Sequence, residues 1–148
     1  MIAALLLAAQ GLAPEAAADI FLSACAAGLR DPAAFAESAA RLNFAQVEER
    51  GRSALFRAGN VELLYEQGAH CALRAPIEGD PRLVIERVST SLGLAPPQAI
   101  AMHPPGWTRY RWPIADGPAP RFYLAAGTIM DHQGAMSLDL SIHAGPAQ

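Results

Sequence analysis

Arginines near the carboxyl end of the chain are the residues whose spacing most clearly allows binding chemistry. Arg109 and Arg111 alternate with Tyr110, and Arg121 precedes the next apolar run. Residues on paired strands come within about 5 Å of one another, so these guanidinium groups could gather on the polar face of a sheet. Guanidinium groups hold carboxylates and phosphates through paired hydrogen bonds. The sequence therefore indicates an anion site at these three arginines or, as the alternative, a solvated sheet face on which Asp139 is a partner.

Histidine and cysteine do not form a recognisable catalytic or metal-binding pattern. His70, His103, His132 and His143 lack the helical spacing and the paired cysteines typical of a zinc site. His70 directly precedes Cys71, but neighbours on a strand point to opposite faces, so this imidazole cannot readily activate that thiol. The chain also lacks a Gly-x-Ser-x-Gly elbow, a phosphate-binding loop and a dinucleotide fingerprint. We therefore predict no catalytic residue, no metal and no cofactor.

Composition narrows the class of protein. A chain of 148 residues fits a single domain, and 52% hydrophobic content with 17% charged residues is typical of a folded protein. The net charge is −3 and the pI is near 5.7, although every basic residue is arginine. Nucleic-acid binding normally requires a basic patch and a high pI, so this composition argues against a nucleic-acid partner.

The amino-terminal stretch bears on the compartment. Ile2 to Ala9 is an uncharged apolar run, and Ala16-Ala17-Ala18 offers a small-x-small cleavage site before Asp19. We expect residues 1–18 to be a signal peptide and residues 19–148 to be the mature domain, in the periplasm or secreted. The alternative is an apolar helix that packs on the core. Stable membrane insertion is not expected, because Ile2 to Ala13 is 12 residues long and a membrane span needs ~20.

Hydrophobic periodicity supplies the elements that position these residues. Helical spacing predicts three helices, two of which follow an Asp-Pro start signal. Period-two alternation predicts two groups of three strands, with a polar connector at Gln46 to Gly51 and a proline-rich loop at Ala95 to Pro105 that contains a short extended piece. The expected fold is α+β, with an antiparallel sheet of about six strands in two βββ meanders and helices packed on one face. The helices are expected at 14–29, 32–42 and 81–92, and the strands at 53–57, 61–66, 70–75, 107–112, 121–130 and 134–143.

The two cysteines lie on faces that can meet. Cys25 falls on the apolar stripe of the first helix beside Phe21 and Leu29, and Cys71 shares a strand face with Leu73. Both sulfurs should therefore point into the layer between helix and sheet, which allows a Cys25–Cys71 disulfide in an oxidising compartment. Two buried thiols that act as small apolar groups are the alternative.

The short apolar leader, Phe21-x-x-x-Cys25 in a helix, the later Asp31-Pro32 start and a single second cysteine resemble the small exported proteins of alphaproteobacteria, of the sphingomonad type. The resemblance implies export and pairing of Cys25 with Cys71, and it brings no activity with it. We expect an exported non-catalytic domain that binds a protein or a small ligand through its sheet face or its proline-rich loop. The alternatives are a Cys- or His-dependent hydrolase and a structural or stress-related envelope protein.

Overall fold

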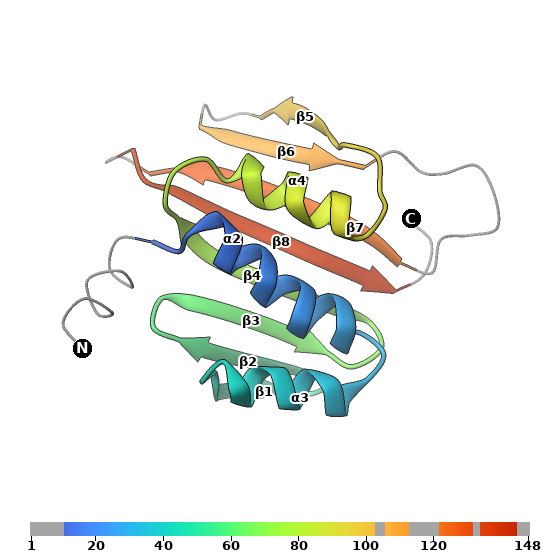
Figure 1. Cartoon of the computed structure of the whole chain (residues 1–148). Coiled ribbons are helices and arrows are strands. Elements are labelled where there is room, and N and C mark those ends of the chain that lie inside the picture. The colour runs from blue at the N-terminus through green and yellow to red at the C-terminus, as the bar shows by residue number, and fades with distance from the viewer. Residues whose placement is uncertain (1–10, 103–105, 113–121, 132–133, 145–148) are drawn as a thin grey trace.

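A computed structural model describes residues 11–102, 106–112, 122–131 and 134–144 (Figure 1). No helix within these ranges is long and apolar enough to cross a membrane. The helical segments are α2 (Pro14–Ile20), which continues as the π-helical η1 (Phe21–Ala26), α3 (Pro32–Arg41) and α4 (Arg82–Ser91). The strands are β1 (Ala45–Arg50), β2 (Ser53–Ala58), β3 (Val61–Glu66), β4 (His70–Ile77), β5 (Gln98–Ala101), β6 (Trp107–Arg111), β7 (Phe122–Met130) and β8 (Met136–Ala144).

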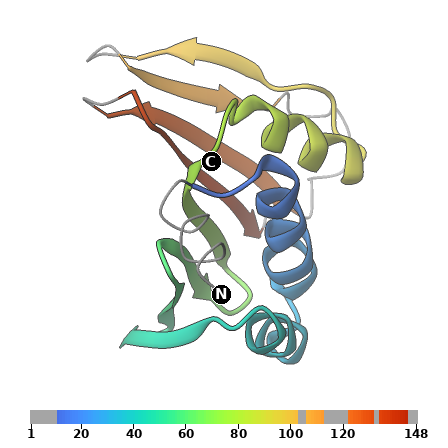
Figure 2. The same ribbon diagram turned by 60° about the vertical axis from the view of Figure 1, so that its left-hand side comes forward.

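The strands form one antiparallel sheet in the order β1-β2-β3-β4-β8-β7-β6-β5. At its centre β4 pairs with β8 from His70–His143 to Ile77–Met136. Helices α2, α3 and α4 all lie on the same face of the sheet (Figures 1 and 2). The predicted α+β class, with an antiparallel sheet and helices on one face, is confirmed. The sheet has eight strands rather than about six, because each meander contains four strands rather than three.

The two additional strands are the edges of the sheet. The expected connector after α3 forms β1, which is exposed at every position and pairs with β2. At the other edge, the short extended piece of the proline-rich segment is β5, which pairs with β6. A strand with neither face buried carries no period-two hydrophobic pattern, so β1 could not be recognised by alternation.

The two halves of the sheet repeat one topology. Each half is a helix followed by a four-stranded meander, and exchanging β1–β4 with β5–β8 leaves the strand order unchanged. Both helices follow an Asp-Pro pair, and both end in a Schellman motif. The bonds that define these motifs run from the N–H groups of Phe44 and Leu94 to the carbonyl oxygens of Ala39 and Ser89, respectively.

The core lies between the helices and the sheet. Strand residues of one parity face the helices, and the register aligns them in rows across the strands. One such row contains Phe56, Leu63, Leu73, Leu140, Ala126 and Tyr110. Its central leucines are fully buried, and burial of apolar area is the main favourable contribution to folding. The residues of the opposite parity face away from the helices, where the candidate site lies.

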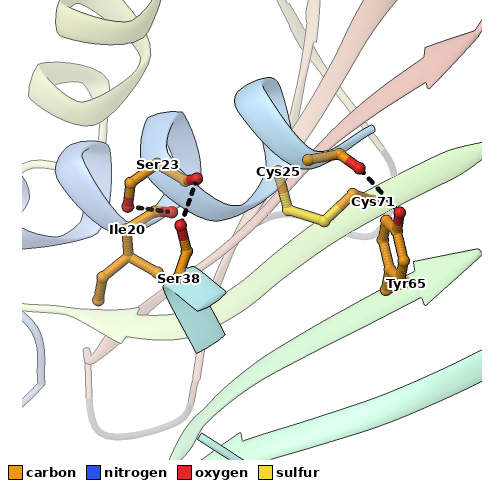
Figure 3. Close-up of a disulfide and its surroundings, with 7 residues drawn as sticks. Ile20, Ser23, Cys25, Ser38, Tyr65 and Cys71 are labelled. Carbon is orange, nitrogen blue, oxygen red and sulfur yellow. Dashed lines mark hydrogen bonds between the residues drawn. A yellow bond between two sulfur atoms is a disulfide. The ribbon is translucent and has the colours of Figure 1, made fainter. Parts of the chain in front are cut away.

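A disulfide joins the helical layer to the sheet. Cys25 of η1 and Cys71 of β4 are bonded, with their Cα atoms 5.2 Å apart, and both side chains are fully buried (Figure 3). The predicted bridge is therefore confirmed. Beside it the hydroxyl group of Tyr65 donates a 2.8 Å hydrogen bond to the carbonyl oxygen of Gly28, which ties β3 to the end of the same helix.

Residues ahead of Asp19 are part of the folded domain. Leu12 forms a parallel bridge with Ile77 at the end of β4. Ala17 and Ala18 are fully buried, and α2 packs against α4. Cleavage after Ala18 would remove these contacts and would expose the surfaces that they cover. The ordered domain thus extends at least to residue 11, ahead of the expected boundary at Asp19.

Candidate binding groove on the uncovered face of the sheet

The face of the sheet opposite the helices is hollow. Figure 2 shows the two ends of the sheet bending away from the helices. The groove has a volume of about 660 Å³ and is lined by residues of β3, β4, β6, β7 and β8. Sites for small molecules typically have volumes of about 300 to 1,000 Å³. The uncovered face can therefore accommodate a small ligand.

Small side chains form the floor of this groove. Ala125 of β7 lies directly opposite Ser141 of β8, and Gly127 lies directly opposite Asp139. A Cβ atom built at Gly127 would meet nothing nearer than the carbonyl oxygen of Thr108, at 3.8 Å. The space above Gly127 is therefore open. The depth of the groove comes from small residues on β7 and β8, together with the bend of the sheet.

Charged side chains form a single row across the uncovered face, and all of them except Arg57 line the groove. The register places Arg57, Glu62, Arg74, Asp139, Gly127 and Arg109 opposite one another on successive strands. Nη2 of Arg57 lies 2.8 Å from Oε2 of Glu62, and Nε of Arg74 lies 3.0 Å from Oδ2 of Asp139. Exposed ion pairs of this kind contribute only about 0.2 to 1 kcal/mol each. Their main effect is therefore to hold the charges of four residues in fixed positions.

Arg109 ends this charged row without a partner. Within the described residues its guanidinium group makes neither a hydrogen bond nor an ion pair. Trp107, two positions earlier on the same strand, is 49% exposed, and it lies opposite Ile129 of β7. Met102 joins these two side chains in the lining and is 40% exposed. The groove thus has an apolar wall beside an unpaired cation, a combination suited to an amphipathic anion.

The structure brings together part of the predicted arginine cluster. Arg109 and Arg111 are exposed on the uncovered face, whereas Tyr110 between them is buried on the helix-covered face. Arg109 lines the groove and Arg111 does not. Arg121 lies outside the described residues. Asp139, expected as a partner for these arginines, is paired with Arg74 instead. Anion binding at this face stays a prediction.

Two histidines and a tyrosine stack at one end of the same face. His143 lies between His70 and Tyr123 in the register, with ring centres 5.1 Å and 4.7 Å away, respectively. Nε2 of His143 lies 2.9 Å from the hydroxyl oxygen of Ser141. Burial, and next the charge of His70, lower the pKa of His143, so its imidazole is neutral near pH 7.

The same parts of the chain offer little to other site chemistries. The disulfide leaves neither Cys25 nor Cys71 as a free thiol. Across the described residues, no group of three or more His, Cys, Asp or Glu side chains is arranged to hold a metal ion. His103 and His132, which were considered with the other histidines, lie outside those residues.

Sequence reasoning found Arg109 but missed the groove. The alternation of Trp107, Arg109 and Arg111 was visible, and it correctly assigned these side chains to one face of β6. The open position at Gly127 was not visible, because it depends on which residues of β6 and β8 lie beside it. A glycine inside an otherwise regular strand pattern was the available signal, since such a residue marks a place where something approaches the backbone closely.

Comparisons of this chain with protein-family models, with curated proteins and with solved structures found no match.

Proposed function

We propose that this chain is an exported, non-catalytic domain that binds a small ligand in the groove on the uncovered face of its sheet. The observation that carries the proposal is the guanidinium group of Arg109, which has no partner among the described residues, beside the exposed ring of Trp107 and over a floor of small residues. A half-exposed tryptophan that is not needed for the core is typical of a ligand contact. In this chain the wall and the cation face the same cavity.

Export rests on separate observations. A disulfide persists in an oxidising compartment, and an apolar leader at Ile2 to Ala9 precedes the domain. Because Leu12 and the buried Ala17 and Ala18 belong to the fold, we favour a mature chain that begins before Leu12 over one that begins at Asp19. Intact-mass measurement on protein from the periplasm of its native host tests both points. Recovery of the whole chain, including Met1, from the cytoplasm would contradict export.

Ligand binding can be tested with 8-anilinonaphthalene-1-sulfonate, a fluorescent aromatic monoanion. We expect saturable binding of one probe per chain, and weaker binding to the Trp107→Ala variant. Leu83→Ala is the matched control, because Leu83 is 50% exposed but belongs to α4 on the helix-covered side. The groove would lose its support as the site if both variants bound the probe as tightly as the unchanged protein does.

A His-dependent hydrolase is the second candidate, and the contact between Ser141 and His143 is the observation that favours it. A hydroxyl group within hydrogen-bond reach of a neutral imidazole is the first requirement of a serine nucleophile. The rest of the local structure is less suitable for catalysis. Because β8 pairs with both β4 and β7 along its length, its backbone N–H groups form hydrogen bonds within the sheet and are not available to stabilise an oxyanion. Mass spectrometry after exposure to p-nitrophenyl acetate tests this candidate, because a nucleophilic Ser141 would carry an acetyl group that His143→Gln prevents.

A further inference from the structure

The charged row across the groove has one empty position. From Arg57 to Asp139 the sign alternates on successive strands, and each cation there has a carboxylate beside it. The next position is Gly127, which has no side chain, and beyond it lies Arg109. A negative charge on the Arg109 side of Gly127 would give Arg109 the carboxylate partner that Arg57 and Arg74 already have, while Asp139 on the other side of Gly127 is paired with Arg74. The open position therefore lies beside the one guanidinium group of this row that has no partner within the described residues.

Counting the charges of the row defines the charge of the missing group. The row contains three arginines, at positions 57, 74 and 109, and two carboxylates, at positions 62 and 139, so one positive charge is left over. A single negative charge would balance it. Arg111 lies on the same face of β6 but two positions along the strand, opposite Ala125 rather than Gly127, so it is not part of this row and does not add to the count.

The dimensions of the open position suit a carboxylate. Neighbouring strands lie about 4.8 Å apart, so the backbones of Arg109 and Asp139 are separated by about 9.6 Å with Gly127 between them. A Cβ atom at Gly127 would have no contact shorter than 3.8 Å. A planar carboxylate above this glycine can therefore accept hydrogen bonds from Arg109, and charge-assisted bonds of this type are among the stronger ones in proteins.

The apolar wall lies next to the same position. Trp107 and Ile129, which are directly opposite each other, are one side-chain pair further along β6 and β7 from Arg109 and Gly127 on the same face. An apolar group attached to the carboxylate would lie against these two side chains and against Met102, and it would cover apolar area that is now exposed.

We propose that the groove binds a monocarboxylate with an apolar body, whose carboxylate occupies the position above Gly127 and pairs with Arg109 while the body packs on Trp107 and Ile129. This inference rests on the proposed function and names the class of ligand. It also predicts that the protein can be made to fill its own site, because a carboxylate side chain introduced at position 127 would lie opposite Arg109 on one strand and opposite Asp139, which is already paired with Arg74, on the other.

The test uses octanoate as the probe, with octan-1-ol and octyl phosphate as comparisons, each below its aggregation concentration. Binding to the full chain is followed by the amide shifts of β6 and β7 in ¹⁵N–¹H NMR spectra. We expect octanoate to bind at least about tenfold more tightly than octan-1-ol, because of these two probes octanoate alone carries a negative charge that can pair with Arg109. Octyl phosphate, with its second negative charge, should bind no more tightly than octanoate.

Variants locate the carboxylate. We expect Arg109→Gln and Gly127→Glu each to weaken octanoate binding by about tenfold or more, while octan-1-ol binding to Arg109→Gln stays unchanged. Arg111→Gln is the matched control for Arg109→Gln, and it should stay within about twofold of the unchanged protein, since it removes a guanidinium group of the same strand face that lies outside the groove lining. Thermal melting of every variant confirms that it is folded before its binding is compared.

The outcomes separate this inference from the proposed function. Equal binding of octanoate and octan-1-ol in the groove would overturn the carboxylate assignment and leave the groove as a binding site. Much tighter binding of octyl phosphate would overturn it in favour of a phosphate ligand. If none of the three probes shifted groove amides, and 8-anilinonaphthalene-1-sulfonate also failed to bind, both the inference and the proposed function would be wrong.

Discussion

The two faces of the sheet are built from the same strands but differ in what their side chains do. On β7, Leu124, Ala126 and Thr128 point toward the helices and are buried, while Ala125 and Gly127 between them line the groove. The helix-covered face is filled by close packing and crossed by a disulfide. The uncovered face holds small residues, exposed ion pairs and an arginine, Arg109, that has no partner in the part of the chain that the structure describes. Alternation along one strand thus separates the residues that stabilise the domain from those available for recognition.

This separation predicts that substitutions on the two faces have different effects. Changes on the helix-covered face should lower the free energy of unfolding and leave the affinity of the folded protein for the groove probes unchanged. Changes on the uncovered face should alter the affinity for the groove probes and leave the free energy of unfolding nearly unchanged. Exposed ion pairs contribute little to stability, and no helix of the described chain covers that side. The predictions below test this separation, beginning with the largest expected effect.

Loss of the disulfide should have the largest effect on stability. Replacing both cysteines in Cys25→Ala/Cys71→Ala frees a loop with a sequence separation of 46 residues. The loop-entropy argument predicts a fall of about 4 kcal/mol in the free energy of unfolding, measured by urea denaturation. Binding of 8-anilinonaphthalene-1-sulfonate at low urea should be retained, because both sulfurs lie on the other side of the sheet. A variant as stable as the unchanged protein would contradict the structural role of the bridge.

Removal of α2 should have the next largest effect. A chain of residues 19–148 lacks the bridge between Leu12 and Ile77 and the fully buried Ala17 and Ala18, all of which a chain of residues 11–148 retains. We expect the shorter chain to be less stable by about 2 to 3 kcal/mol, from about 0.8 kcal/mol for each of the two buried alanine methyl groups and about 1 kcal/mol for the partly buried side chain of Leu12. Urea denaturation of the two chains measures the difference. Equal stability would instead support cleavage after Ala18.

Much of the fold could be predicted from the sequence because most of its helices and strands are specified by residues close to one another in the chain. Helix starts at Asp31-Pro32 and Asp80-Pro81, and alternation in β7 and β8, depend on neighbours within a few residues. The disulfide could be predicted because Cys25 and Cys71 each lie on an apolar face that packs into the same layer. The polar edge strand β1 could not be predicted, because it buries neither face and therefore has no hydrophobic alternation. Its pairing with β2 follows from the turn after Arg50.

The candidate site was harder to predict because it depends on register between strands that are far apart in sequence. Arg109, Gly127 and Asp139 become neighbours through the pairing of β6 with β7 and of β7 with β8. The alternation placed Arg109 on the polar face, and Asp139 was considered as a partner for the three predicted arginines, but in the structure it pairs with Arg74 of β4. A shift of one residue in either pairing would have turned these side chains to the other face.

A pair of glycine substitutions compares the two faces directly. A Cβ atom at Gly28 would come within 2.6 Å of Cβ of Phe35 and 2.9 Å of its Cα, whereas at Gly127 the nearest atom is 3.8 Å away. We expect Gly28→Ala to lower the free energy of unfolding by about 2 kcal/mol through overpacking, and Gly127→Ala to change it by less than about 0.5 kcal/mol. Thermal or urea denaturation measures both. Similar losses in the two variants would contradict the separation between a packed face and an open one.

The smallest expected effect is a pH dependence that arises on the uncovered face. Burial and the charge of His70 lower the pKa of His143 below its usual value of 6.5, although Asp139 acts in the opposite direction. Between the lowered pKa and 6.5 the unfolded chain binds more protons than the folded chain, so the free energy of unfolding rises with pH across this window and falls as the pH drops through it. His143→Gln should abolish this dependence of the free energy of unfolding on pH. His70→Gln should reduce it, because the charge of His70 no longer lowers the pKa of His143. The carboxyl group of Asp80, whose pKa is lowered by its hydrogen bonds with Arg82, titrates below 3.8 and acts in a separate, more acidic range. Urea denaturation in steps between pH 8 and pH 5 measures the slope, and a slope that His143→Gln leaves unchanged would assign the titration to another group.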